Sequence, residues 1–420
     1  MLRPRENQEK AEAPLESPSN ARLHPWVIVA AGVHFRGGMD KANAALASYL
    51  LAAGTPVHIV AHDVDPLFLE GRAARVHLVP RPAGSFAIGE FLLERRGLRV
   101  AREVVMQSPE TRVVVNGGNC AWPDVNWVHY VHSAWTDIDP AAPLWFKLKH
   151  RTFSAGWRRR ERVALRAARV VVANSDQTRT HLMGHLKLPP QRIKTVYLGA
   201  DRSWGEVSTD ERAAARRWLA IPDTRPVVAF VGGLGFDGRK GVDTLWAAWL
   251  ELCADPGWDA DLVVAGGGRA LERIVRAVER AGMSQRFRVL GPTDRVRDVL
   301  ASADLLVSPV RYEPYGLNVH EAICRGIPAL ISGCAGIAER YPADLADMLL
   351  GDPTSVGELV DRLRLWRSHI DSWKRRIGPL GQMLRAYSWD DMARSFVDAV
   401  ECRPPERNVT SVTEAVGAAL

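Results

Sequence analysis

The chain alternates short apolar runs with longer amphipathic stretches, and it passes through this alternation twice. Apolar runs joined by helical stretches are typical of βαβ units around a parallel sheet. The first series lies between residues 26 and 201, and the second begins at residue 225. Because 420 residues exceed one ordinary core, we predict an α/β protein of two Rossmann-like domains, whose parallel sheets face each other across a cleft.

The predicted strands are apolar runs rich in Val, Ile and Leu, at residues 26–33, 57–63, 112–119, 126–132, 169–175, 193–201, 225–233, 261–268, 288–291, 304–310 and 328–333. Helices are expected over 35–54 and 389–401, and a polar segment at 202–222 separates the two series. The expected division is a disordered leader (1–23), an N-terminal domain (24–205), a C-terminal domain (206–385), a C-terminal helix (386–403) and a loose tail (404–420).

The charge and the cysteine content of the chain indicate which ligands and which cellular compartment suit it. The 55 Lys and Arg residues exceed the 48 Asp and Glu residues, which gives a formal charge of +7. This excess suits anionic ligands such as nucleotide phosphates, and a merely solvated basic surface is the alternative. The five cysteines are scattered without a Cys-x-x-Cys pair, which argues against a zinc site or a disulfide framework and favours the cytoplasm. The polar leader does not resemble a secretory signal, and no apolar run is long enough for a transmembrane helix.

The strongest functional signal is the segment 311–328, which directly follows the predicted strand 304–310. Ligands of open α/β sheets bind at the carboxyl ends of the strands, so Glu313 is expected to face the cleft. The helix that opens at Gly316 has free N–H groups in its first turn, and its dipole favours a diphosphate there. Two ordinary surface acids are the alternative interpretation of Glu313 and Glu321. The residues expected to bind the ligand in this segment are Tyr315, Gly316, Leu317, Asn318 and Glu321.

A second ligand-binding signal is the glycine-rich loop within residues 230–245. Glycines such as Gly232 let the backbone approach phosphate closely, and Arg239 and Lys240 supply positive charge for two phosphates. The same loop satisfies the G-x-G-x-x-G pattern of dinucleotide sites. We favour a compact diphosphate, because the basic pair follows the glycines immediately.

The first domain offers two further candidates. Gly37 and Gly38 lie between the first strand and its helix, where they leave room for a ligand across the cleft, a simple tight turn being the alternative. His129 and His132 lie three residues apart near the end of the predicted strand 126–132, so they are expected to point to opposite faces. We choose His132, nearer the carboxyl end, as the catalytic candidate, and a satisfied structural histidine is the alternative.

Two Asp-x-Asp triplets, at residues 63–65 and 137–139, raise the question of a metal. Such triplets can hold a divalent cation on a diphosphate. Neither lies beside the proposed phosphate loop, so we predict no metal and no cofactor. Lys240, Arg239 and the helix dipole are expected to stabilise the leaving diphosphate instead.

The quoted segments resemble the retaining glycosyltransferases of family 4, which have the GT-B fold. EPYGLNVHE reproduces that family's motif of two glutamates separated by seven residues, at Glu313 and Glu321. FVGGLGFDGRKGVDTL resembles its phosphate loop, with the family's lysine at Lys240. RERVALRAARVVVANSDQT and YLGAD are also similar to family segments, and YSWDDMARSF resembles the helix that crosses back between the domains. In place of the family's usual Gly-Arg pair, this chain has Gly232 followed by another glycine.

The resemblance implies a hexosyltransferase that moves a sugar from a nucleotide-diphosphate donor to a hydroxyl acceptor, with retention of anomeric configuration. The C-terminal domain would bind the donor and the N-terminal domain the acceptor, which would be a glycan, a lipid-linked molecule or a small molecule, as in polysaccharide or glycolipid biosynthesis. Glu313 would contact the transferred sugar and Glu321 the ribose. The departing phosphate would take the acceptor proton.

The segment 143–162 mixes aromatic with basic side chains. Such a segment could lie on the inner, anionic face of a membrane, which would make the protein peripherally associated. We favour the alternative, a helix that packs its aromatic residues on the N-terminal sheet and exposes a basic face.

Three classes of function compete on these observations. A glycosyltransferase explains the paired glutamates, the basic glycine loop and the two domains together. A nucleotide-sugar epimerase of the same fold would share the phosphate site without acceptor-dependent turnover. A non-catalytic basic binding protein would explain the charge alone, and the chain lacks the regular interleaving of aromatic and basic residues that binding of a single-stranded nucleic acid needs.

Overall fold

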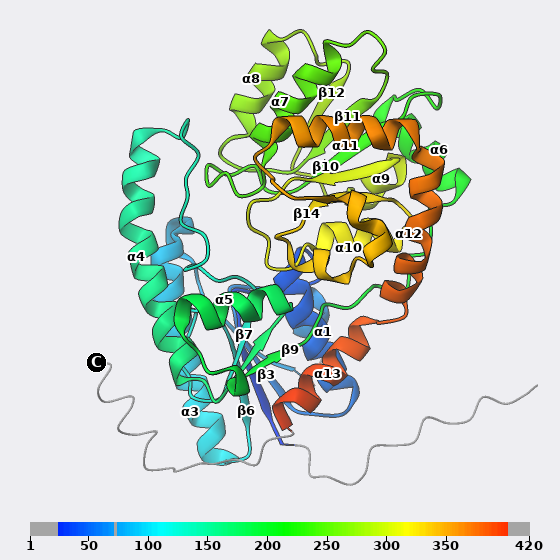
Figure 1. The fold of residues 1–420 in the computed structure, drawn as a ribbon. Coiled ribbons are helices and arrows are strands. Elements are labelled where there is room, and N and C mark those ends of the chain that lie inside the picture. The colour runs from blue at the N-terminus through cyan, green and yellow to red at the C-terminus, as the bar shows by residue number, and fades with distance from the viewer. Residues whose placement is uncertain (1–23, 71–73, 402–420) are drawn as a thin grey trace, which may run out of the picture.

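The computed structural model describes residues 24–70 and 74–401. The predicted leader (1–23) and tail (404–420) lie outside the described residues. The described chain forms two parallel sheets flanked by helices, with the sheet of the C-terminal half above that of the N-terminal half in Figure 1. The prediction of an α/β fold with parallel sheets in two domains is therefore confirmed.

The N-terminal sheet has seven strands in the order β5-β3-β1-β6-β7-β8-β9, all parallel. Its central strands are buried on both faces, which explains their continuous runs of valine. The strands are β1 (Trp26–Val29), β3 (Val57–Ala61), β5 (Ala74–Leu78), β6 (Arg112–Asn116), β7 (Val125–Val128), β8 (Val170–Ala173) and β9 (Ile193–Thr195). The helices are α1 (Gly38–Ala52), α2 (Pro66–Glu70), α3 (Phe86–Gln107), α4 (Leu144–Ala167) and α5 (Asp176–Leu186). Two short strands, β2 (Gly32–Val33) and β4 (Asp63–Val64), pair separately.

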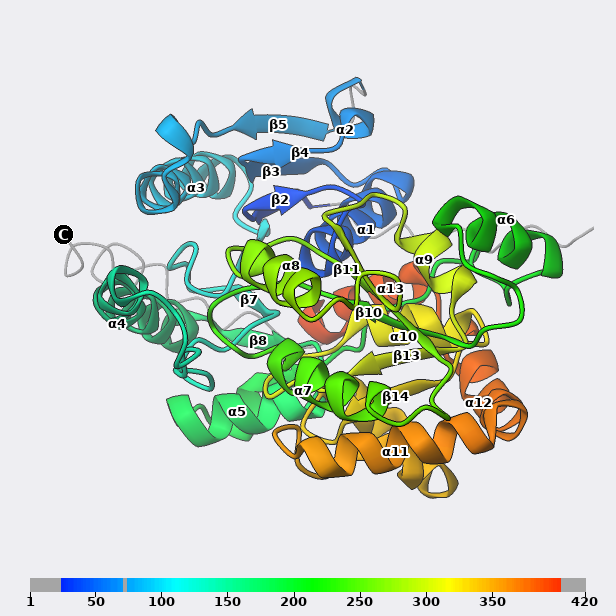
Figure 2. The same ribbon diagram turned by 90° about the horizontal axis from the view of Figure 1, so that it is seen from above.

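The C-terminal sheet has six parallel strands in the order β12-β11-β10-β13-β14-β15. These are β10 (Val227–Val231), β11 (Asp261–Ala265), β12 (Phe287–Gly291), β13 (Leu305–Ser308), β14 (Ala329–Ser332) and β15 (Leu349–Leu350). The helices are α6 (Thr209–Leu219), α7 (Val242–Cys253), α8 (Leu271–Arg280), α9 (Val296–Ser302), α10 (Leu317–Cys324), α11 (Val356–Ser368) and α12 (Ile370–Arg385). Figure 2 shows α7 and α11 side by side, and they pack against each other on this domain.

The chain passes between the domains twice, and the two passing segments touch. The Ala200 N–H donates to the Tyr387 carbonyl oxygen (2.8 Å), and the Trp389 N–H donates to the Ala200 carbonyl oxygen (3.2 Å). Gly199 permits this approach, because a Cβ at that position would lie 2.4 Å from the Ser388 carbonyl oxygen. The final helix α13 (Trp389–Glu401) then packs on α1 and β8 of the N-terminal domain, at the lower right of Figure 1.

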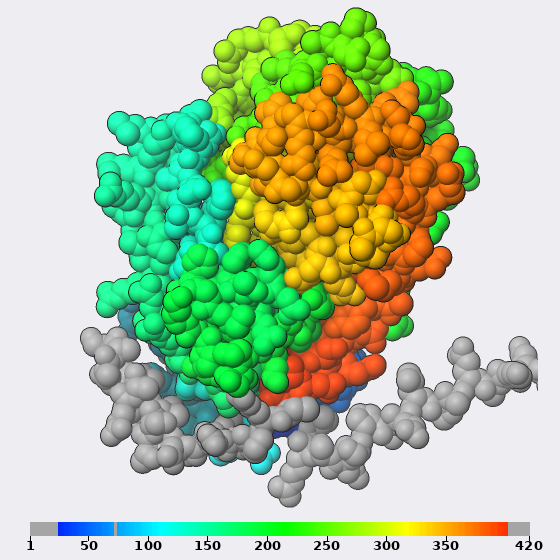
Figure 3. All heavy atoms as spheres, in the orientation of Figure 1, coloured from blue at the N-terminus to red at the C-terminus, as the bar shows by residue number. Residues whose placement is uncertain are grey.

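Helix α4 departs from the favoured interpretation of segment 143–162. Its buried residues are Glu161, Ala164 and Leu165, near its C-terminal end. At the other end, Trp145 is 54% exposed and Phe153 is 40% exposed. Packing of these aromatic residues on the N-terminal sheet is therefore wrong, because this half of α4 extends past the sheet and stands beside the C-terminal domain (Figures 1 and 3).

No helix within residues 24–70 and 74–401 is both long enough and apolar enough to cross a bilayer. Peripheral association of α4 with a membrane stays a prediction.

Candidate active site

The two strongest sequence segments meet at the carboxyl edge of the C-terminal sheet. Strands β10 and β13 pair directly, and the strand order reverses between them, which is where open α/β sheets bind ligands. The Arg311 N–H donates to the Arg239 carbonyl oxygen (2.8 Å). At Gly241 a Cβ would lie 1.8 Å from the Pro309 carbonyl oxygen, so only glycine allows the two loops to approach this closely. The glycine loop and the glutamate segment therefore form one wall of the cleft.

Glu313 and Lys240 form an ion pair on this wall. Their side chains are 14% and 16% exposed, so water screens the pair poorly. Arg239 lies beside them and donates from Nε to an Asp237 carboxylate oxygen (2.9 Å). Burial opposes the charge of Arg239, but the carboxylates of Glu313 and Asp237 outweigh burial and raise its pKa. The site therefore holds two cationic side chains, Lys240 and Arg239, next to the carboxylates of Glu313 and Asp237.

The start of α10 lies in the same segment as Glu313. Gly316 precedes the helix with φ of 106°, and a Cβ there would lie 2.9 Å from Ile337 Cγ2, so this position requires glycine. The backbone N–H groups of Gly316, Leu317 and Asn318 donate no hydrogen bond to any described residue. These groups and the positive end of the helix dipole are available to an anion.

Two residues predicted at this helix start serve the fold through their side chains. Tyr315 is 2% exposed, and its hydroxyl lies 2.6 Å from Nδ1 of His320. The Asn318 side-chain amide donates to the Val231 carbonyl oxygen at the end of β10 (2.8 Å), which ties α10 to the sheet. Their roles in donor binding stay predictions. Gly232 begins the phosphate loop, and a Cβ there would lie 3.7 Å from Lys240 Cδ.

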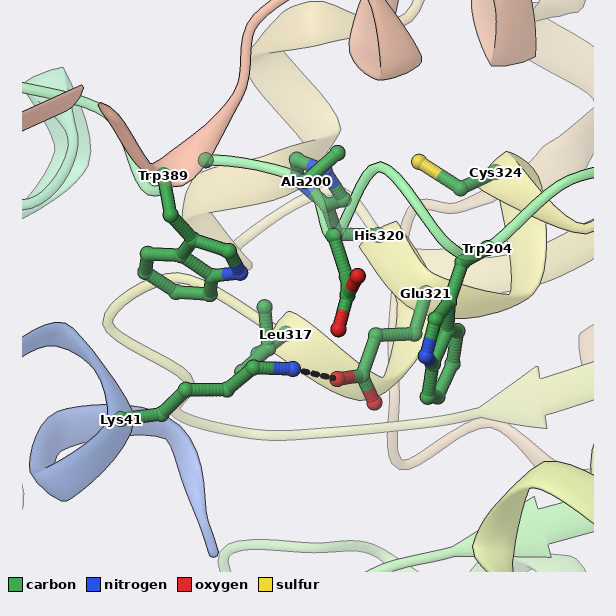
Figure 4. A pocket seen from close by; sticks show the side chains of 10 residues that line it. Lys41, Ala200, Trp204, Leu317, His320, Glu321, Cys324 and Trp389 are labelled. Carbon is green, nitrogen blue, oxygen red and sulfur yellow. Dashed lines mark hydrogen bonds and ion pairs between the residues drawn. The ribbon is translucent and has the colours of Figure 1, made fainter. Parts of the chain in front are cut away.

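Glu321 lies in a separate, tightly enclosed hollow between the domains. One of its carboxylate oxygens is 3.2 Å from Nζ of Lys41, which reaches across from α1 (Figure 4). The same ammonium lies 5.4 Å from the ring centres of both Trp204 and Trp389. Burial raises the pKa of Glu321, and the charge of Lys41 opposes this shift in part. The structure therefore brings Glu313 and Lys240 together but gives Glu321 a different lysine.

The glycine turn of the first domain touches the start of α10. Gly37 has φ of 79° and precedes α1. A Cβ built on Gly38 would lie 3.7 Å from Leu317 Cδ2, so the two domains are in contact here. A larger side chain at Gly38 would narrow the approach to the helix start.

The prediction for the two histidines was wrong in its geometry, and the choice of His132 as the catalytic residue stays a prediction. Strand β7 ends at Val128, so neither residue lies on the strand. Both ring nitrogens of His129 are buried, and neither forms a hydrogen bond with a described residue. The His132 ring lies 4.8 Å from the Tyr130 ring centre and 5.8 Å from that of Trp157, and these three residues line one hollow. Burial lowers the pKa of His132 to about 4, so its ring is neutral at physiological pH.

A buried carboxylate that we did not predict holds the His132 loop. Glu161 of α4 accepts hydrogen bonds from the backbone N–H groups of His132 (2.7 Å) and Ser133 (3.2 Å). Burial raises the pKa of Glu161, and these hydrogen bonds oppose the shift. The sequence offered one signal for this residue: Glu161 is the one acidic residue of α4, which otherwise carries mainly basic and apolar side chains.

Several interdomain contacts also escaped prediction. The Tyr312 hydroxyl accepts a hydrogen bond from the Val131 N–H (2.9 Å). Ser175, which caps α5, donates from its hydroxyl to the Pro314 carbonyl oxygen (2.6 Å). The Glu339 carboxylate accepts from the N–H groups of Asp176 (2.8 Å) and Gln177 (3.1 Å). These bonds hold the described domains in a closed arrangement around the segment that carries Glu313.

Within the described ranges, no group of three or more His, Cys, Asp or Glu side chains is placed to hold a metal ion. One acid of each triplet instead meets a basic side chain, since Asp63 pairs with Arg36 (2.9 Å) and Asp139 with Arg273. Independence of a metal stays a prediction.

Two protein families match the chain, one in each half. Residues 36–204 match the family described as Glycosyltransferase Family 4. Residues 225–366 match the family described as Glycosyl transferases group 1. The predicted resemblance is thereby supported for both domains, and retention of configuration stays a prediction.

Curated relatives carry related names. An uncharacterized glycosyltransferase of Methanocaldococcus jannaschii is 26% identical, over 54% of this chain and 58% of the relative. The 2-deoxystreptamine glucosyltransferase of Streptomyces kanamyceticus is 30% identical, over 47% and 51%. The D-inositol 3-phosphate glycosyltransferase of Nocardia farcinica is 32% identical, over 54% and 51%. The matched part of the chain spans about half the length of these relatives.

Solved structures match over a larger share of the chain. WaaG, a glycosyltransferase involved in lipopolysaccharide biosynthesis, has a TM-score of 0.65 at 20% identity and covers 90% of this chain and 99% of its own. Sucrose-phosphate synthase from Thermosynechococcus elongatus has a TM-score of 0.69 at 18% identity, over 89% and 98%. HepE of Anabaena in complex with UDP and glucose has a TM-score of 0.65 at 15% identity, over 90% and 100%. At these identities the likeness concerns the fold.

Proposed function

We propose, from the place of this chain in the GT-B glycosyltransferase superfamily, that it transfers a sugar from a nucleotide-diphosphate donor to a hydroxyl acceptor with retention of configuration. One observation carries the proposal, namely the meeting of Lys240, Glu313 and the unpaired N–H groups of α10 at the point where the strand order reverses. A cation, a helix start and a carboxylate in one place suit a phosphate with a sugar attached.

The donor diphosphate is placed against the start of α10. There the N–H groups of residues 316–318 would donate to phosphate oxygens, and Lys240 would exchange its pairing with Glu313 for the phosphates. Arg239, whose charge is secured by its carboxylate neighbours, adds a second cation. Among the nucleotides UDP is the first to test, because HepE, a protein of similar fold, was crystallised with UDP and glucose.

The transfer step follows from the charges that develop. The bond between the sugar C1 and the donor phosphate oxygen breaks, and C1 gains positive charge. The acceptor hydroxyl oxygen forms its bond to C1 on the face that the phosphate leaves, and its proton passes to the departing phosphate oxygen. The products are a glycoside and a nucleoside diphosphate. Lys240, Arg239 and the helix dipole would stabilise the charge that builds on the diphosphate.

Two side chains are assigned to the reacting sugar. Glu313, released from Lys240 by the phosphates, would accept hydrogen bonds from the sugar hydroxyls and face the positive charge at C1. His132 is uncharged because burial lowers its pKa to about 4, so its ring can accept a hydrogen bond from the sugar or the acceptor. Stabilisation by fixed cations in place of a metal completes the proposal.

The test begins with thermal unfolding in the presence of UDP, GDP, ADP and NAD. One nucleoside diphosphate should raise the unfolding temperature, and NAD should not. The matching UDP-, GDP- or ADP-sugars are then incubated with and without a panel of hydroxyl acceptors, in the presence of EDTA. Acceptor-dependent release of the diphosphate, with an α-linked product by NMR from an α-linked donor, supports the proposal.

The opposite outcomes are equally clear. Stabilisation by NAD alone would replace the proposal with a dinucleotide site. A changed sugar without transfer to any acceptor would identify a nucleotide-sugar epimerase. An inverted anomeric centre in the product would retain the transferase but remove the retaining step.

A further inference from the structure

A hollow of about 350 Å³ lies beside the proposed donor site, and its walls come from both domains. From the N-terminal domain come the loop after β7 and residues 146–157 of α4. From the C-terminal domain come residues 235–239 of the phosphate loop and Arg269. Arg239 links the two sites, because it lines the hollow and neighbours Lys240 in sequence. A molecule in this hollow would therefore lie next to the donor diphosphate.

The walls of the hollow are mainly aromatic. They are formed by the rings of Tyr130, Trp135, Phe146, Trp157 and Phe236. Phe146 and Phe236, from different domains, meet edge to face at 5.3 Å. Trp135 is fixed by donation from its ring N–H to the Asp237 carbonyl oxygen (3.1 Å). Fixed rings around a space of this size suit the flat apolar face of a small ligand.

The charges that face the hollow are unbalanced. Arg239 is compensated by Asp237 at 2.9 Å. Arg269 stands 5.4 Å from the Trp145 ring centre and forms no ion pair with a described residue. An adjoining hollow shares His150 and Ser154 with this one, and Arg158 lines it. Arg158 also forms no ion pair with a described acidic residue. Positive charge that exceeds the local acids raises the local concentration of anions.

We propose that this hollow is the acceptor site, and that it takes a hydroxyl acceptor that carries both a flat apolar ring and an anionic group. The rings would hold the apolar face, and Arg269 would bind the anion. This inference rests on the proposed transferase function, since an acceptor is needed only there. It goes further by stating the chemical class of the acceptor.

Four glycosides test the apolar ring and the anionic group of the acceptor one at a time and together. Methyl β-D-glucoside has neither feature, phenyl β-D-glucoside has the ring, methyl β-D-glucuronide has the anion, and phenyl β-D-glucuronide has both. Binding is measured by calorimetry with the protein saturated by its stabilising diphosphate. The phenyl glucuronide should bind at least tenfold tighter than the methyl glucoside, with the other two in between. The 6-phosphate of phenyl β-D-glucoside then shows whether phosphate is preferred to carboxylate.

Variants locate the effect in the hollow. Trp157→Ala should remove most of the advantage of the phenyl group, and Arg269→Gln most of the advantage of the anion. Trp157→Phe should keep the phenyl advantage, which guards against a simple folding defect. Trp218 and Arg295 form a similar pair elsewhere on the surface, at 3.9 Å, so Trp218→Ala and Arg295→Gln should change nothing.

The failures of the two proposals are distinguishable. If a diphosphate stabilises the protein but the four glycosides bind alike, the acceptor inference is overturned and the transferase proposal stands. If the glycosides differ as expected but Trp157→Ala and Arg269→Gln bind them like the unchanged protein, this hollow is not the acceptor site. If no diphosphate binds, the donor proposal itself fails.

Discussion

Glu313 and Glu321 each pair with a lysine, but the two lysines come from different domains. Lys240 belongs to the same domain as Glu313, so their ion pair does not require contact between the two domains. Lys41 belongs to α1 of the other domain, so its pair with Glu321 requires the domains to be in contact. Glu313 therefore has its cation whether or not the domains touch, whereas Glu321 has its cation only when the domains are in contact.

The surroundings of the two glutamates differ accordingly. Glu313 faces two cations and the start of α10, which an incoming diphosphate can share. Glu321 is enclosed with Lys41 between Trp204 and Trp389, as Figure 4 shows. A ribose that binds to Glu321 would have to displace the Lys41 ammonium. The Lys41 side chain therefore has to move away from Glu321 before the donor ribose can bind there as predicted.

The largest effect is expected for Glu313→Gln. The change removes a charge that would face the developing cation at C1, so turnover should fall by about 10²–10³-fold. Affinity for the nucleoside diphosphate should change little, because the phosphates meet Lys240 and the helix. Acceptor-dependent diphosphate release and calorimetry measure the two quantities. Glu272→Gln, an exposed acid paired within α8, is the control, and retained turnover in Glu313→Gln would contradict the assignment.

Lys240→Ala should have the next largest effect, and it should act on binding. Loss of a charge-assisted hydrogen bond to phosphate costs about 1.5–3 kcal/mol, which weakens diphosphate binding about 10–100-fold. Calorimetry with the stabilising nucleotide tests this, and Lys194→Ala, an exposed lysine of β9, serves as the control. The double variant Lys240→Ala with Glu313→Gln should bind no better than Lys240→Ala, and recovery would mean that Lys240 merely neutralises Glu313.

Lys41→Met should affect stability and leave the Glu313 site intact. Removal of the lysine leaves a buried carboxylate without its cation, at a cost of about 1–3 kcal/mol. The unfolding temperature of the nucleotide-free protein should therefore fall. Adding Glu321→Gln should restore part of the loss, because the unpaired charge is gone. A double variant less stable than Lys41→Met would show that the two side chains are not coupled.

The smallest expected effect is a pH dependence of the stability that Lys41→Met loses. Burial raises the folded-state pKa of Glu321 above its ordinary value of 4.5. Stability from this group is therefore present below pH 4.5 and falls as the pH rises through the raised pKa. Lys41 holds this pKa down, so Lys41→Met should steepen the fall, and its deficit relative to the unchanged protein should shrink in acid. Unfolding scans between pH 4.5 and 8 measure this, and Glu321→Gln should remove the difference.

Much of the cleft was predictable because its parts are local in sequence. An apolar strand, a glycine turn and a helix start occur in this order twice, from β10 to α7 and from β13 to α10, and each part has a short-range pattern. The carboxyl edge of a parallel sheet then places these parts together by rule. For this reason Glu313 and Lys240 could be expected to meet, although 73 positions separate them in the chain.

Other parts had no local pattern to reveal them. Strand β5 (Ala74–Leu78) lies at the sheet edge and mixes polar with apolar residues, so no apolar run marked it. The aromatic residues of α4 suggested a helix packed on its own sheet, but Phe146 meets Phe236 of the other domain. The strand predicted to carry both histidines ends at Val128, because the following loop is held by Glu161 and Tyr312.

The sequence by itself determined the two parallel sheets, the glycine turns and the charged segment at the start of α10, because these depend on periodicity, backbone sterics and capping within short stretches. The tertiary structure alone decided which lysine meets which glutamate, where the loop after β7 turns, and which rings gather around the hollow between the domains. Those contacts join residues that are far apart in the chain, and their geometry depends on how the two domains close on each other, which no local pattern encodes.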